Sequence, residues 1–85
     1  MKHAGPEALD RLEPLIARVR DLPGLTEKAR GTFYRKSRAF LHFHQDPKGL
    51  FADIRVASED FERIDVTDAD GADRLIELAK ACLPP

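Results

Sequence analysis

The feature that most constrains the fold is a hydrophobic period that changes twice along 85 residues. Between Leu9 and Leu22 apolar residues recur every three or four positions, which is the spacing of one helix face. From Gly31 to Val66 apolar and polar residues alternate, which indicates half-buried strands. Beyond that stretch the helical spacing returns. A chain this short has one small core, so we expect a single domain spanning residues 1–85.

One helix is predicted at each end of this pattern. The first runs from about residue 6 to residue 21. Pro14 lies inside it, so we expect either a kink there or a shorter helix that begins at an Asp10 cap. The second helix follows an N-cap at Thr67 or Asp68. Its apolar stripe is expected to be Ala72, Leu75, Ile76, Ala79 and Leu83.

Four short strands joined by tight turns are predicted between the helices. The clearest turn is Asp46–Gly49, because proline favours its second position and glycine its last. A further turn is expected at Ser58–Asp60. The strands are expected over residues 33–35, 38–44, 50–56 and 61–66. The predicted order is α-β-β-β-β-α, an α+β fold of two layers. In it, a four-stranded antiparallel meander carries the N-terminal and the C-terminal helix on one face.

Pairing Gln45 with Leu50 across the Asp46–Gly49 turn sorts the strand residues into two faces. The face assigned to the core contains Ala39, Leu41, Phe43, Ala52, Ile54 and Val56. The residues expected on the open face are Phe33, Arg35, Arg38, Phe40, His42, His44, Phe51, Asp53, Arg55, Phe61, Arg63 and Asp65. Four of the five phenylalanines would lie on this open face, and an exposed aromatic patch of that kind needs a partner.

Two further pairings complete the expected sheet. A turn at Lys36-Ser37 places Phe33 beside Phe40, and the last hairpin places Ile54 beside Ile64. The composition of the open face depends on these pairings, because a shift of one residue moves every side chain to the other face.

We expect the open face to make this chain a small non-enzymatic binding or interaction module that self-associates. A homodimer or a protein partner would cover the aromatic patch, and the small core favours such an assembly. No catalytic constellation is recognised, and no cofactor is expected. The expected binding residues are Phe33, Arg35, Phe40, His42, His44, Phe51, Asp53, Arg55 and Arg63.

His42 and His44 favour an alternative function, a metal or small-ligand site. Alternate residues of a strand share a face, and Asp53 on the neighbouring strand would add a carboxylate to the two imidazoles. The simpler interpretation is a hydrogen-bonded pair of His42 and Asp53, because a closed metal site usually supplies four ligands.

A further alternative is the binding of single-stranded nucleic acid or DNA. Aromatic rings on an open sheet can stack bases, and the arginines beside them can contact phosphates. However, 14 basic and 15 acidic side chains give a formal charge of −1, which removes any general attraction for nucleic acid.

Cysteine content and hydropathy favour a cytoplasmic protein. Cys82 is the single cysteine, which excludes an internal disulfide and suits a reducing compartment. No apolar run approaches the roughly 20 residues needed to span a bilayer, and the first ten residues have no apolar signal-peptide core. We therefore expect no secretory signal and no membrane contact.

Several segments resemble small uncharacterised bacterial proteins related to the YjbR-like group. The segments that carry the resemblance are Leu22–Gly24, Phe33–Lys36, Phe40–His44 and Gly49–Asp53. The resemblance implies a frataxin-like helix–sheet–helix arrangement, together with a double-wing, DNA-binding description that rests on the fold. This chain departs from the group in being shorter and in lacking a basic surface. Its acidic residues Glu7, Asp10 and Glu13 are too few for a frataxin-type iron-binding ridge, and the resemblance carries over no catalytic residue.

Overall fold

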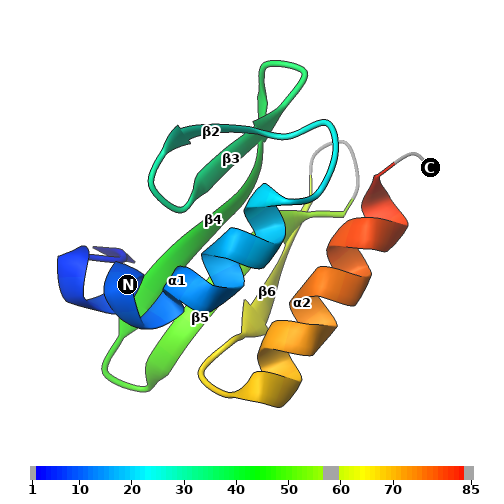
Figure 1. Ribbon diagram of the computed structural model, residues 1–85. Coiled ribbons are helices and arrows are strands. Elements are labelled where there is room, and N and C mark those ends of the chain that lie inside the picture. Colours follow the sequence, from blue (N-terminus) through cyan, green and yellow to red (C-terminus); the bar gives the residue numbers. More distant parts are fainter. Residues whose placement is uncertain (1, 57–59, 84–85) are drawn as a thin grey trace.

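The computed structural model describes residues 2–56 and 60–83, so most of the expected Ser58–Asp60 turn lies outside the described residues. The elements in chain order are β1 (Lys2–His3), α1 (Pro6–Arg20), β2 (Thr26–Ala29), β3 (Thr32–Arg35), β4 (Arg38–Asp46), β5 (Gly49–Arg55), β6 (Phe61–Asp65) and α2 (Ala69–Cys82) (Figure 1). Strands β2 to β6 form an antiparallel sheet in sequence order, and β1 pairs with β4. The expected α+β class is confirmed, but the described residues form six strands instead of four.

The two helices cover one face of the sheet (Figure 1). Their buried apolar stripes and the inner face of the sheet form one hydrophobic cluster. Removing this apolar surface from water stabilises the fold. The largest fully buried side chains of this cluster are Phe33, Ile16, Leu41, Ile54, Leu75 and Val19. Neither α1 nor α2 covers the opposite face of the sheet, so its side chains are available to build a site.

Both helix starts follow from local sequence. Pro6 takes the first position of α1, where a backbone N–H has no intrahelical partner. Helix α1 continues through Pro14 to Arg20, so the shorter helix capped by Asp10 is not formed. At the start of α2, the Asp68 carboxylate accepts a hydrogen bond from the Gly71 N–H at 3.0 Å, and Asp68 is therefore the N-cap.

Strand β2 has no hydrophobic alternation that a sequence pattern could reveal. Three of its four residues are exposed, and an ion pair attaches it to α1. The guanidinium of Arg20 donates to Glu27 at 2.6 and 3.0 Å, and the same carboxylate accepts from the Gly31 N–H at 3.0 Å. Pairing with β3 and polar contacts to α1 therefore hold β2, whereas the inner strands also bury apolar side chains.

The predicted register between β4 and β5 is confirmed. Gln45 pairs with Leu50, and the ladder continues to Leu41 and Ile54. The Asp46–Gly49 turn begins with an Asp46 carboxylate that accepts from the Lys48 N–H at 2.7 Å, as turn-forming aspartates do. Val56 lies beyond the end of β5 and is 38% exposed, so its expected place in the core is wrong.

The expected pairing of Phe33 with Phe40 is wrong because β4 contains a bulge. Phe33 pairs with Leu41 and Tyr34 with Ala39, which leaves Phe40 as an extra, unpaired residue. The bulge turns Phe40 toward the helices, so that Phe40 and its neighbour Leu41 are both buried. Phe33 and Phe40 are 1% and 3% exposed and belong to the core, not to the open face.

The expected pairing between β5 and β6 is wrong by two residues. Ile64 pairs with Ala52, and Asp53 pairs with Arg63. A shift of two residues keeps every side chain on its own face, so the hydrophobic pattern cannot distinguish the two registers. The observed register places an arginine opposite Asp53 on the open face.

Candidate metal centre

The structure divides the expected binding residues into three groups. Phe33 and Phe40 are buried in the core, as described above. Arg35 lies at the end of β3, beside the turn that leads into β4. The residues that remain together on the open face are His42, His44, Phe51, Asp53, Arg55 and Arg63. Of the four phenylalanines expected there, only Phe61 is an exposed large hydrophobic residue in the described part of the chain.

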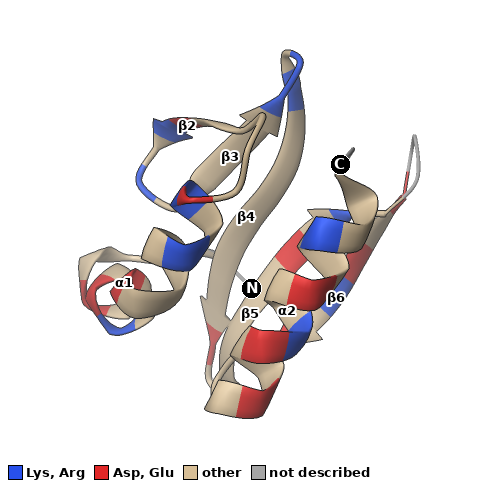
Figure 2. Ribbon diagram, turned by 45° about the vertical axis from the view of Figure 1, so that its right-hand side comes forward, with Lys and Arg blue, Asp and Glu red and all other residues tan. Residues whose placement is uncertain are grey.

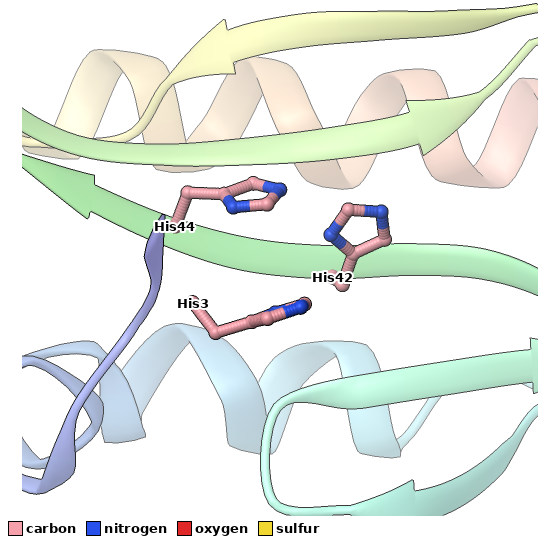
Figure 3. A group of neighbouring side chains, drawn as sticks. All are labelled: His3, His42 and His44. Atoms are coloured by element: carbon pink, nitrogen blue, oxygen red, sulfur yellow. The ribbon is translucent and has the colours of Figure 1, made fainter. Parts of the chain in front are cut away.

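Three imidazoles converge on the open face, on the side of the sheet away from the helices (Figure 3). His42 and His44 project from alternate positions of β4, as predicted. His3 comes from β1, where it pairs with His44. Along one side of β4, the pairing with β3 ends where Thr32 pairs with His42. Strand β1 pairs with the next part of the same side, at His44 and Gln45. His3 is not among the site residues predicted from the sequence, because a two-residue strand leaves no periodic signal.

The three side chains are close enough to share one ion. One ligand atom from each lies within 4.8 Å of the other two. The ring centroids of His42 and His44 are 4.6 Å apart, and the His3 ring stacks on the His44 ring at 5.3 Å. Zinc–nitrogen bonds of about 2.0–2.1 Å place two nitrogens of a tetrahedral site about 3.4 Å apart. Small side-chain rotations would therefore bring all three nitrogens onto one ion.

Several ring nitrogens of this cluster are buried without hydrogen bonds. His42 Nδ1, His44 Nδ1 and His44 Nε2 have no hydrogen-bond partner among the described residues 2–56 and 60–83. Buried polar atoms normally have a partner, and one left without costs about 1–3 kcal/mol. A metal ion can bind one lone-pair nitrogen of each ring, which would remove that cost for one atom of His42 and one of His44.

Asp53 lies next to His44, not hydrogen-bonded to His42 as the simpler interpretation expected. Asp53 Oδ2 is 2.9 Å from His44 Nε2, although the angle is not that of a hydrogen bond. Asp53 Oδ1 accepts from Arg63 Nε at 3.1 Å. The Asp53 side chain is only 14% exposed. Its contacts with His44 and Arg63 hold the carboxylate at the edge of the histidine cluster.

The pKa shifts of two groups in the site favour a neutral His42 beside a charged Asp53. Burial lowers the pKa of His42, and the charges of His44 and His3 lower it further against the opposing effect of Asp53. Burial would raise the pKa of Asp53, but the hydrogen bond from Arg63 and the charge of His44 outweigh it, so that this pKa is lowered. Metal ions bind the neutral form of histidine, so the low pKa of His42 favours binding.

Phe61 and Arg55 form one wall of the site. The Phe61 ring lies 5.5 Å from the His42 ring, and the Arg55 guanidinium carbon lies 4.5 Å above the centroid of Phe61. Arg55 is fixed from its other side, because its Nε donates to the Ala39 carbonyl at 2.7 Å. These contacts shield one side of His42 from water.

The chain matches no protein-family model, no curated protein and no solved structure with significance. The resemblance to the YjbR-like group therefore stays a prediction. Neither helix in the described part of the chain has the length and apolar character needed to cross a bilayer.

Proposed function

We propose that this protein is a non-enzymatic binding module for a divalent transition-metal ion, with His3, His42 and His44 as ligands. The observation that carries the proposal is the convergence of three imidazoles, with ligand atoms within 4.8 Å of one another, on the sheet face that α1 and α2 leave uncovered. Three buried ring nitrogens without a described hydrogen-bond partner support it. The donor set differs from the expected one, because His3 joins the two histidines of β4.

The donor chemistry favours zinc. Imidazole nitrogen suits Zn²⁺, Cu²⁺ and Ni²⁺, whereas Mg²⁺ and Ca²⁺ prefer oxygen ligands. Three protein ligands leave one position of a tetrahedral zinc ion for water or another ligand. Asp53 then acts as an outer partner. Its carboxylate faces His44 Nε2 and leaves His44 Nδ1 for the metal.

The self-associating module expected from the sequence has less support. Two of the phenylalanines expected to form its aromatic patch, Phe33 and Phe40, are buried in the core. Phe61 remains exposed, but it packs against His42 and Arg55 as part of the metal site. The residues of the proposed metal site, in contrast, do lie on the open face of the sheet.

The test is a zinc titration by calorimetry on untagged protein that has been freed of metal by chelator. We expect one ion per chain. His42→Ala and His44→Ala should each abolish measurable binding, because two imidazoles alone make a weak site. Asp53→Asn should weaken binding about 10–100-fold, as the loss of an outer partner does. Asp73→Asn, which changes a well exposed carboxylate on α2, is the matched control and should bind like the unmodified chain.

Two results would contradict the proposal. One is binding well below one ion per chain. The other is binding that survives both histidine substitutions, since this would place the ion elsewhere. Replacing zinc by cobalt adds a structural readout, because tetrahedral cobalt absorbs visible light strongly and octahedral cobalt does not.

A further inference from the structure

A second group of chemically similar side chains lies at the tip of the β3–β4 hairpin, away from the histidines. Figure 2 shows this tip in the colour of lysine and arginine. The tip residues Arg35, Lys36 and Arg38 line a hollow of about 340 Å³, together with Arg55. The rest of its lining is apolar or small and consists of Ala39, Phe40, Val56 and Cys82. No acidic side chain among the described residues lines the hollow.

The hairpin tip places like charges together and has an unfavourable backbone. Arg35 and Arg38 are directly paired across the hairpin, and like charges in that position repel each other. Lys36 and Ser37 between them have φ values of 51° and 71°. Two-residue turns of this kind strongly prefer asparagine, aspartate or glycine. The repulsion between like charges and the strained backbone both oppose folding. Such locally unfavourable features are often found at functional sites.

Four arginines outside the hollow are ion-paired. Arg18, Arg20, Arg30 and Arg63 each lie within ion-pair distance of a carboxylate. Arg35 and Lys36 form no ion pair with the described residues, and Arg35 is half-buried. Arg38 and Arg55 have other interactions of their own, and Arg55 is held in place by the Ala39 carbonyl. Among the described residues, the lining of the hollow thus carries four basic side chains and no acidic one, on a protein whose net charge is −1.

We infer that this hollow binds the phosphate group of a small organic phosphate ester. Guanidinium groups match phosphate oxygens with paired hydrogen bonds, and an ammonium group adds charge. The apolar part of the lining would receive the organic part of the ester. The volume is at the lower end of small-molecule sites, and a single hollow differs from the extended basic track that a nucleic-acid backbone requires. Arg55 borders both the hollow and the histidine cluster, but phosphate binding in the hollow does not require a bound metal ion.

The experiment is a titration of the isotope-labelled protein with phenyl phosphate, followed by the amide signals of Arg35 to Phe40. Phenol, inorganic phosphate and a short thymidine oligonucleotide are titrated in parallel. We expect saturable shifts at the hairpin with phenyl phosphate, weaker binding of inorganic phosphate at the same signals, and no shifts there with phenol. Arg35→Gln should weaken binding of phenyl phosphate about ten-fold or more, since a hydrogen bond to a charged group is lost.

Arg74→Gln is the matched control, because it removes an exposed arginine of α2 that does not line the hollow. It should leave the affinity unchanged. Lys36→Gln, at an exposed turn position, provides a second variant if Arg35→Gln does not fold. Equal losses in Arg35→Gln and Arg74→Gln would overturn the inference, because they would indicate attraction by general charge. Shifts produced equally by phenol would also overturn it. Tighter binding of the oligonucleotide at the same signals would assign the surface to nucleic acid instead.

Discussion

Replacing Phe40 by alanine tests the bulge that separates the observed sheet from the expected one. Phe40 is 3% exposed and packs in the cluster beneath the sheet. Truncation of a buried phenylalanine costs about 3–5 kcal/mol, from lost burial and from the cavity left behind. A chain of 85 residues has a free energy of unfolding of about 4–13 kcal/mol. The substitution should therefore remove a large part of the stability.

Phe61→Ala is the matched control, because Phe61 is 40% exposed on the open face. It loses the ring contacts with His42 and Arg55, which we expect to cost about 1 kcal/mol. Urea unfolding followed by circular dichroism measures both variants. With a slope of about 1–3 kcal/mol per molar urea, Phe40→Ala should lower the midpoint by at least about 1 M.

The two variants together decide where Phe40 lies. If Phe40→Ala lowers the midpoint no more than Phe61→Ala does, Phe40 is not in the core and the bulge is misplaced. In that case the regular pairing of Phe33 with Phe40, on the open face, would be the correct one.

Three further results are expected. Ser37→Gly should raise the free energy of unfolding by about 1 kcal/mol and the melting temperature by about 4–8 °C, because glycine tolerates φ = 71°; a decrease would show that the turn does not need this conformation. The pKa of His42 is below its ordinary value of 6.5 in the fold, so the unfolded chain takes up a proton first. The free energy of unfolding should therefore fall as the pH drops through 6.5, and urea titrations of His42→Gln should show a weaker pH dependence. Zinc at 100 times its dissociation constant should raise the free energy of unfolding by about 2.7 kcal/mol, and a melting curve unchanged by zinc or chelator would contradict the metal site.

The sequence predicts a structure well where two independent signals agree. Between β4 and β5 the turn residues of Asp46–Gly49 and the apolar face of the strands require the same register, and that register is confirmed. Between β5 and β6 the expected Ser58–Asp60 turn does not fix the number of loop residues, and the hydrophobic pattern accepts a shift of two residues. In the β3–β4 hairpin the two-residue turn is correct, since Arg35 pairs with Arg38, but no residue type marks the extra residue at Phe40.

The candidate site was predictable to the extent that it lies on regular strands. His42 and His44 share a face because they are two residues apart, and the confirmed register brings Asp53 beside them. His3 is about 40 positions away and reaches the site through a contact of only two residues. Its place follows from how the N-terminal segment packs along β4, which is a tertiary contact that no local spacing encodes.

The placement of His3 on a separate short strand has a thermodynamic consequence. Strand β1 is held by its pairing with β4, by a hydrogen bond from the Ala4 N–H to the Phe43 carbonyl, and by one from the Gly5 N–H to the Gln45 side chain. An ion shared by His3 and the two histidines of β4 would add a further attachment between β1 and β4. The two equilibria are then linked. If docking of β1 on β4 raises the metal affinity by some factor, metal binding raises the docking equilibrium constant of β1 by the same factor. Amide hydrogens of β1 would thus exchange with solvent more slowly when the metal is bound, and their exchange rate would report on metal occupancy.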